Sequence, residues 1–181
     1  MDNLTQELEQ ELKLAGQAKN LDHGHKKTIV LGADHAGFEL KEHIKNFLRT
    51  KDYQVEDEGA FSYDEDDDYP KVCRIVAKRI AGGAGAYLGL LFGGSGQGEA
   101  MTANRVLGAR ATVFYGGSGD ILKLSREHND ANILSLGARF ITPKEAETAI
   151  LLWLETDFSG ADRHIRRIQK IDGLITEENI F

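Results

Sequence analysis

Four short apolar runs, separated by longer segments with helical periodicity, constrain the fold of this chain more than any other feature. The runs are TIVLGA (28–33), AYLGLLF (86–92), ARATVFY (109–115) and NILSLGA (132–138). Short apolar runs without polar alternation are typical of parallel strands buried on both faces. A weaker strand is expected within YQVEDEG (53–59).

The segments around these runs predict helices, because their apolar residues recur at helical spacing. These segments are FELKEHIKNFLRT (38–50), YPKVCRIVAKRIAGG (69–83), GEAMTANRV (98–106), GDILKLSREHN (119–129), PKEAETAILLWLET (143–156) and ADRHIRRIQKI (161–171). The alternation predicts an α/β protein, a Rossmann-like doubly wound parallel sheet of about five strands with helices on both faces. Such sheets bind ligands at the carboxyl ends of their strands, so we expect every candidate motif to lie at that edge.

The length of the chain leaves room for one domain. With 181 residues, 41% of them hydrophobic, the chain can bury one core of ordinary size. Residues 1–27 are polar, but Leu4, Leu8 and Leu12 have helical spacing. We therefore expect an appended helix and linker over residues 1–27 and the functional domain over residues 28–181.

Charge and cysteine content exclude several classes of partner. The chain has 22 Lys and Arg against 29 Asp and Glu, a net charge of -7, and no long basic run. We therefore expect no nucleic-acid partner and no binding to an anionic membrane. No apolar stretch is long enough for a membrane span. Cys73 is the only cysteine, which rules out an intramolecular disulfide and favours a cytoplasmic location.

The stretch LLFGGSGQGEAMTANRV (90–106) joins an apolar run to a helix through a glycine-rich loop. Such a loop can hold an anion, because its backbone N–H groups converge at a helix N-terminus. It lacks the Lys-Ser/Thr pair of a P-loop and does not belong to the first strand–helix unit, which disfavours a nucleotide. The Ser95 hydroxyl and the Glu99 carboxylate could instead hold an oxyanion beside a base. Glu99 could equally be an ordinary acid of the first helical turn.

Two further candidates lie near the first run. Asp34 and His35 follow it in GADHAGFELK, where they could orient a hydroxyl and handle a proton, or form a helix cap with a surface histidine. The acidic stretch DEDDDYP (64–70) lacks the glycine and glutamate of a calcium loop, so a solvated loop is favoured. Only Tyr69 of this stretch is expected to face a site.

A second group of candidates lies toward the carboxyl terminus. His128 and Asn129 precede the fourth run in SREHNDANILSLGAR, and Arg139 follows it. Histidine in such a place is as often structural as catalytic. On the helix over 161–171, Arg163 and Arg167 are one turn apart on a cationic face that also holds Lys170, and two such guanidinium groups fit a phosphate. A plain solvated face remains the alternative.

Taken together, the blocks GADHAGFELK, DYP, GGSGQGEAMTANR, SREHNDANILSLGAR and DRHIRRI resemble the ribose-5-phosphate isomerase type B family, which also includes the galactose-6-phosphate isomerase subunits. The resemblance covers about residues 28–172 and does not extend to the first 27. It implies an aldose–ketose isomerase of phosphorylated sugars that uses no metal and no cofactor. It also implies a homodimer or a dimer of dimers, with active sites shared between subunits.

The resemblance implies roles at the matching positions. His128 would open the sugar ring, and Asp34 would hold substrate hydroxyls. The phosphate contacts would be His35, Arg139, Arg163 and Arg167, and further substrate contacts would be Tyr69 and Asn129. The backbone of Gly94, Gly96 and Gly98, together with the Ser95 hydroxyl, would surround the developing enediolate.

One position departs from the pattern of many family members. Where they carry a cysteine that moves the proton, this chain has Gly93. It is similar to the branch in which the glutamate at the start of the helix is the base, so we expect that role for Glu99, with a pKa below neutrality. Cys73 is expected in the core.

The expected reaction converts ribose 5-phosphate to ribulose 5-phosphate, a step of the pentose phosphate pathway. One alternative is isomerisation of a six-carbon sugar phosphate such as allose or galactose 6-phosphate. The other is a non-catalytic sugar-phosphate-binding subunit, which Gly93 and the additional residues at the N-terminus favour.

Overall fold

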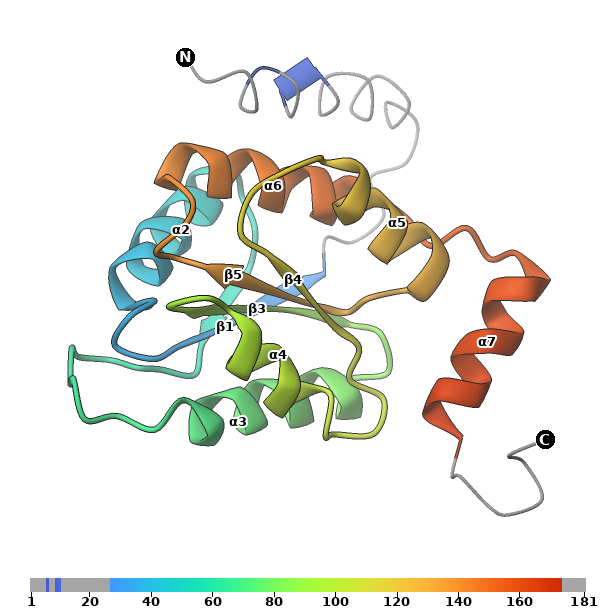
Figure 1. Cartoon of the computed structure of the whole chain (residues 1–181), viewed down its shortest axis with the longest axis horizontal. Coiled ribbons are helices and arrows are strands. Elements are labelled where there is room, and N and C mark those ends of the chain that lie inside the picture. Colours follow the sequence, from blue (N-terminus) through green and yellow to red (C-terminus); the bar gives the residue numbers. More distant parts are fainter. Residues whose placement is uncertain (1–5, 7–8, 11–26, 174–181) are drawn as a thin grey trace.

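The computed structural model describes residues 6, 9–10 and 27–173 (Figure 1). The helix and linker expected over residues 1–27 lie mostly outside the described residues and stay a prediction. The strands are β1 (Thr28–Ala33), β2 (Val55–Asp57), β3 (Tyr87–Gly93), β4 (Ala111–Phe114) and β5 (Ile133–Gly137). The helices are α2 (Phe38–Thr50), α3 (Tyr69–Gly82), α4 (Gln97–Ala103), α5 (Asp120–Asn129), α6 (Pro143–Glu155) and α7 (Asp162–Asp172).

The five strands form one parallel sheet in the order β2-β1-β3-β5-β4. This confirms the doubly wound α/β fold expected from the alternation of apolar runs and helices. The strand order reverses between β1 and β3, which are neighbours in the sheet. Ala33 pairs with Phe92, so the carboxyl ends of β1 and β3 lie side by side. A reversal of this kind opens a crevice in which such sheets bind ligands.

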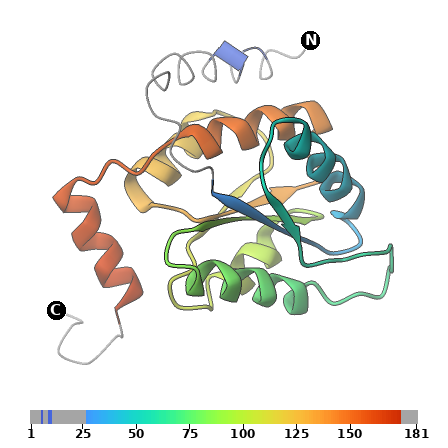
Figure 2. The same ribbon diagram turned by 180° about the vertical axis from the view of Figure 1, so that it is seen from behind.

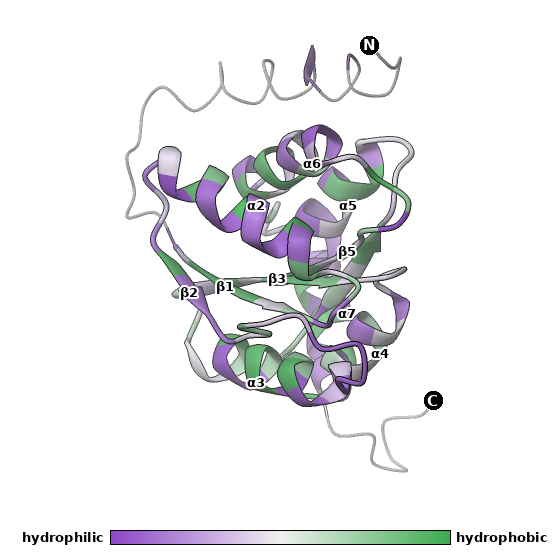
Figure 3. Ribbon diagram, turned by 90° about the vertical axis from the view of Figure 1, so that its left-hand side faces the viewer, coloured by the Kyte–Doolittle hydropathy of each residue, from purple (hydrophilic) through white to green (hydrophobic). Residues whose placement is uncertain are grey.

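Helices cover both faces of the sheet. Helices α2, α5 and α6 lie on one face, and α3 and α4 lie on the other (Figures 1 and 2). Figure 3 shows the sheet between these two helical layers. Each layer encloses an apolar core, with Phe92 and Trp153 in the larger and Val76 and Leu91 in the smaller. The three central strands β1, β3 and β5 are buried, as their uninterrupted apolar sequences predict, whereas the edge strand β2 and most of β4 are half-buried. Among the described residues, no helix combines the length and the apolar character needed to cross a bilayer.

Helix α2 packs against the sheet without an intervening side chain at its first turn. A Cβ atom at Gly37 would lie 2.2 Å from the backbone carbonyl carbon of Phe92, so only glycine fits. The Gly37 N–H donates to Asp34 Oδ1 at 3.0 Å, which fixes this carboxylate at the end of β1.

Helix α2 also holds the segment that follows β2. The buried Lys41 Nζ donates to both Asp57 carboxylate oxygens and to the Ala60 carbonyl oxygen, each at 2.8 Å. A buried ammonium group needs such partners. These contacts tie the start of the loop between β2 and α3 to the same edge of the sheet as Asp34.

Helix α7 stands apart from the sheet (Figures 1 and 2). It is held at its C-terminal end by an ion pair of Asp172 with Arg110, 2.8 Å from oxygen to nitrogen. Near its N-terminal end, the Ser159 N–H donates to the Glu127 carbonyl oxygen at 3.1 Å. Its apolar side chains remain partly uncovered in the single chain, since Ile165 and Ile171 are both exposed.

Candidate active site

The carboxyl ends of β1 and β3 bring the first group of candidate residues together. Asp34 follows β1, and the glycine-rich loop joins β3 to α4. Glu99 lies in the first turn of α4 and is only 4% exposed. Arg139 follows β5 at the same edge, and its backbone N–H donates to the Gly94 carbonyl oxygen at 3.2 Å. This edge therefore holds two carboxylates, a guanidinium group and the loop.

The Glu99 carboxylate occupies the space that a side chain at Gly93 would fill. A Cβ atom at Gly93 would lie 2.0 Å from Glu99 Oε1 and 2.1 Å from its Cδ. The carboxylate therefore rests directly against the backbone at the end of β3. The absence of a side chain at Gly93 is what gives Glu99 its place.

The loop itself is shaped by backbone conformation and by one buried hydroxyl group. Gly96 has a φ of 75°, a left-handed conformation that glycine adopts without strain, and it caps α4. The Ser135 hydroxyl donates to the Gly96 carbonyl oxygen at 2.7 Å. Ser135 was not among the sequence candidates, although a single polar residue in a buried strand is a signal that could have found it. Its hydrogen bond holds the loop on β5.

Ser95, Gly98 and Tyr69 lie around this loop. The Ser95 Oγ accepts a hydrogen bond from the Gln97 N–H at 3.3 Å, so its own proton can be donated elsewhere. A Cβ atom at Gly98 would lie 2.7 Å from Tyr69 Oη, so the phenol group rests against the loop. The first residue of α3 therefore lies against the loop, and its part in a site stays a prediction.

Burial governs the electrostatics of Glu99. It raises the pKa of the Glu99 carboxyl, and the negative charge of Asp34 raises it further. A hydrogen bond from the backbone N–H of Glu99 itself acts in the opposite direction but does not prevail. The pKa of Glu99 thus lies above its ordinary value, whereas the helix N-terminus alone would lower it. Burial also raises the pKa of the Cys73 thiol, as is usual for an inert core cysteine.

His35 is bound to a residue that we had expected to be solvated. Its Nδ1 lies 2.8 Å from Asp67 Oδ1, and this hydrogen bond raises the pKa of the imidazole. The expectation of a solvated acidic loop is therefore wrong for Asp67, although the remaining acids of the stretch 64–68 are exposed. Five acids in a row look alike in a sequence, and only the tertiary contact distinguishes one of them.

Among the described residues, Asp34, His35 and Asp67 are the one group that brings three possible metal-ligand atoms within 4.8 Å of one another. These atoms are engaged in hydrogen bonds. Asp34 accepts the Gly37 N–H, and a proton lies between His35 and Asp67. The group is therefore a hydrogen-bonded network, and we assign no metal to it.

His128, Asn129, Arg163 and Arg167 lie elsewhere, at the amino ends of the strands. Helix α5 ends at Asn129, and β5 begins four residues later. A helix between two parallel strands runs against them, so its last turn lies at the amino edge of the sheet. Our expectation that every motif lies at the carboxyl edge is wrong for this group. The five residues of β5 alone span roughly 17 Å between the two edges.

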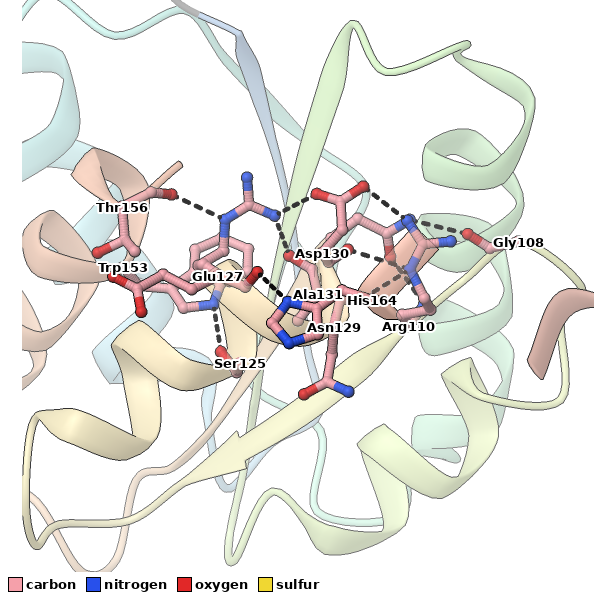
Figure 4. A network of polar contacts seen from close by, with 12 residues as sticks. Gly108, Arg110, Ser125, Glu127, Asn129, Asp130, Ala131, Trp153, Thr156 and His164 are labelled. Atoms are coloured by element: carbon pink, nitrogen blue, oxygen red, sulfur yellow. Dashed lines mark hydrogen bonds and ion pairs between the residues drawn. The ribbon is translucent and has the colours of Figure 1, made fainter. Parts of the chain in front are cut away.

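A network of charged and polar contacts fixes the turn that carries His128 and Asn129 (Figure 4). Asp130 adopts a left-handed conformation with a φ of 43° and ends α5. Its carboxylate lies 3.0 Å from both Arg110 and Arg126. The Arg126 side chain is buried beside the Trp153 ring and also donates to the Thr156 carbonyl oxygen at 3.2 Å. The turn is therefore held from two sides.

A histidine that we had not singled out connects α7 to this turn. The buried His164 ring packs on His128, with 4.3 Å between ring centroids. Arg163 Nε donates to His164 Nε2 at 3.0 Å, which identifies Nε2 as the acceptor of a neutral ring. Burial lowers the pKa of His164, in keeping with this assignment. His164 therefore holds Arg163 beside His128, and Arg167 is exposed one turn further along.

Comparisons with known proteins agree on one family. A family model described as Ribose/Galactose Isomerase matches residues 29–171. Ribose-5-phosphate isomerase B of Mycobacterium leprae is 45% identical over 140 residues, which are 77% of this chain and 85% of that protein. Ribose-5-phosphate isomerase B of Escherichia coli is 35% identical over 153 residues, 84% of this chain and 99% of that protein.

Solved structures are similar over the same region. The crystal structure of ribose-5-phosphate isomerase B from Mycoplasma genitalium with bound ribulose-5-phosphate has a TM-score of 0.77 and 36% identity, and the match covers 82% of this chain and 96% of that chain. A ribose 5-phosphate isomerase from Thermotoga maritima has a TM-score of 0.76 and 41% identity, with 83% and 100% covered.

The burial of Glu99 predicts a pH-dependent change in stability. Its pKa is higher in the folded chain than in the unfolded one, so its ionisation weakens folding. This loss is absent below about pH 4.5, grows as the pH rises, and is complete above the folded-state pKa. We expect Glu99→Gln, which cannot ionise, to have a higher free energy of unfolding than the wild type at about pH 7.5 but not at about pH 4. Urea unfolding at both pH values checks this, and equal stability at about pH 7.5 would contradict it.

Proposed function

This chain belongs to the ribose/galactose isomerase family, and from that premise we propose that it interconverts ribose 5-phosphate and ribulose 5-phosphate with Glu99 as the base. The observation that carries the proposal is the position of Glu99. Its buried carboxylate lies against the backbone of Gly93 at the end of β3, next to the glycine-rich loop. Relatives with this activity cover most of the chain, and one similar structure holds ribulose-5-phosphate. We also propose that the enzyme acts in the cytosol and uses neither metal nor cofactor.

The chemistry follows from the groups at the carboxyl edge. Glu99 takes the proton from C2 of the open-chain aldose, the C2 electron pair forms the C1–C2 double bond, and the charge moves to O1. Backbone N–H groups of the loop and the Ser95 hydroxyl stabilise this enediolate. Asp34 holds the substrate hydroxyls. Glu99 then returns the proton to C1, the proton of the O2 hydroxyl passes to O1, which becomes the C1 hydroxyl group, and C2–O2 becomes the ketose carbonyl.

The remaining groups act from a second copy of the chain. Within one chain, His128, Arg163 and Arg167 lie at the amino edge, too far away to share a sugar phosphate with Glu99. In the two-fold dimer that we propose, the amino edge of one copy meets the carboxyl edge of the other, twice over. His128 of one copy then opens the ring bound beside Glu99 of the other, and Asn129 adds a substrate contact.

An apolar patch supports this assembly. The Tyr115 and Phe140 side chains, 50% and 64% exposed, pair with 6.1 Å between ring centroids, and Met101 of α4 is also exposed. Side chains of this size are usually covered when they lie together beside a site. We propose that a second copy covers them, which makes the homodimer the smallest active unit.

The phosphate is held by cations from both copies. Arg163 and Arg167 supply two guanidinium groups one helical turn apart, a spacing that suits a dianion. Arg139 and His35 supply positive charge from the carboxyl edge, and Tyr69 closes the site beside the loop.

Two other functions have less support. The family description includes galactose, so a six-carbon sugar phosphate is a second candidate substrate, and steady-state rates with ribose 5-phosphate and with allose and galactose 6-phosphates distinguish them. Gly93 and the additional N-terminal residues favoured a non-catalytic sugar-phosphate-binding subunit. The carboxylate of Glu99 fills the space at Gly93, which weakens the first of these two reasons.

We expect Glu99→Gln to lose turnover while keeping substrate affinity. The amide keeps the shape of the side chain but cannot take a proton, so kcat should fall by roughly two to four orders of magnitude. Binding of inorganic phosphate should stay close to wild type. Exchange of the C2 proton with solvent deuterium should slow in parallel with kcat. Exchange at near wild-type rates in folded Glu99→Gln protein would mean that another residue is the base.

Gly93→Ala should have a similar effect through displacement of the base. The added methyl group would occupy the position of the Glu99 carboxylate, 2.0 Å from Oε1, so the side chain must leave its seat. We expect kcat to fall by at least about tenfold, with little change in phosphate affinity. Gly82→Ala is the matched control, because a Cβ atom there meets nothing within 4 Å. Wild-type kcat in Gly93→Ala would show that the position of the carboxylate is not limiting.

Mixing two inactive variants tests the shared site. Glu99→Gln and His128→Ala each destroy both sites of a homodimer, but a mixed dimer has one site with both changes and one with neither. Unfolding and refolding the two variants together should restore about a quarter of wild-type activity, since half of the random dimers hold one intact site. The separately refolded variants are the control. No recovery in a mixture that forms mixed dimers would place His128 and Glu99 in the same copy.

A further inference from the structure

The loop between β2 and α3 carries five consecutive acidic residues, of which one is bound to the site. Its start is tied to α2 through the Ala60 carbonyl oxygen and Lys41. Its end is continuous with α3, whose first residue is Tyr69. A turn closes between these ends, since the Asp67 N–H donates to the Asp64 carbonyl oxygen at 3.2 Å. The backbone of Asp67 is therefore held by this turn on one side and by the start of α3 on the other.

This turn directs the Asp67 carboxylate at His35. The distance from Asp67 Oδ1 to His35 Nδ1 is 2.8 Å, and both side chains are partly buried, 19% and 26% exposed. The Tyr63 ring of the same loop meets the imidazole edge-on, with 6.1 Å between centroids. The imidazole thus has one nitrogen engaged and one flank covered by the acidic loop.

We infer that Asp67 is a positioning residue, which holds His35 with Nδ1–H donated inward so that Nε2–H is presented to the substrate phosphate. A hydrogen bond at one ring nitrogen determines which nitrogen faces the ligand. A neutral ring bound in this way, with Nδ1–H donated to Asp67, would have Nε2 as an acceptor, which a phosphate dianion repels. Only the doubly protonated ring donates to both groups. The inference rests on the proposed function, because it assumes a phosphorylated ligand.

The charges around His35 favour this doubly protonated form. Asp67 and Asp34 both raise the pKa of the imidazole, with the hydrogen bond to Asp67 as the largest effect. Partial burial and the positive charge of Arg139 lower it. Without the Asp67 carboxylate the ring should lose its second proton at lower pH. The charge of His35 therefore differs between the wild type and the variant within one pH window, which lies between the His35 pKa of the variant and that of the wild type.

The test compares Asp67→Asn with Asp67→Glu and with a matched control. Asp67→Asn keeps the size of the side chain and removes its charge. Asp66→Asn is the matched control, because it removes the charge of a neighbouring acid that is exposed. Among the described residues, only the backbone N–H of Asp66 forms a hydrogen bond, to Asp64 Oδ1, and the substitution leaves that bond in place. Three quantities are measured for each: the pKa of His35 by NMR titration of its side chain, the dissociation constant of inorganic phosphate against pH, and kcat and KM for ribose 5-phosphate. His35→Gln identifies the His35 resonances.

Asp67→Asn should lower the His35 pKa and, within the window, raise both KM and the phosphate dissociation constant by roughly three- to tenfold, as for a lost charge-assisted contact. The value of kcat should change little, because the proton transfer does not pass through His35. Asp67→Glu should recover part of the affinity, and Asp66→Asn should behave as wild type.

Two results would overturn the inference. One is an unchanged His35 pKa in Asp67→Asn, and the other is a shifted pKa with unchanged phosphate affinity. Neither measurement requires the protein to be catalytically active. If the wild type does not isomerise ribose 5-phosphate, the proposed function fails, while the titration and the phosphate binding still decide the role of Asp67.

Discussion

The close approach of two helices to the carboxyl end of β3 is the constraint on which the rest of the site depends. Helix α2 meets Phe92 through Gly37, and the Glu99 side chain of α4 meets the backbone of Gly93. Because neither glycine has a side chain, both helical N-termini reach the reversal of strand order between β1 and β3. Asp34 and Glu99 are thereby brought close together, and the negative charge of Asp34 adds to the effect of burial in raising the pKa of Glu99.

A network of ion pairs organises the opposite edge of the sheet, at the amino ends of the strands. Asp130 joins Arg110 to Arg126, and Arg110 also holds Asp172 at the far end of α7. These ion pairs connect the turn after α5 to the C-terminal end of α7, whose N-terminal half is held by the buried His164 (Figures 1 and 4). Partly buried ion pairs add little stability compared with apolar packing, but they require one geometry. The network therefore fixes the relative positions of His128 and Arg163 more than it contributes to the stability of the fold.

The architecture could be predicted from the sequence because strand burial and helical periodicity are local signals. β1 spans 28–33 as predicted. The glycine-rich loop joins a strand to a helix, as its place directly after an apolar run predicts. Tertiary properties could not be predicted in this way. The upward direction of the Glu99 pKa depends on the depth of burial, and the role of Asp67 depends on a contact across 32 residues. His128 was assigned to the wrong edge because the motif 125–139 spans the whole sheet.

The contact between Gly93 and Glu99 couples the two positions in any substitution. A residue with a Cβ atom at position 93 and a glutamate at position 99 compete for one volume. A side chain at position 93 therefore fits only where the residue at position 99 differs in size or in conformation. Substitutions at the two positions should be strongly non-additive, so that each position restricts what the other can hold.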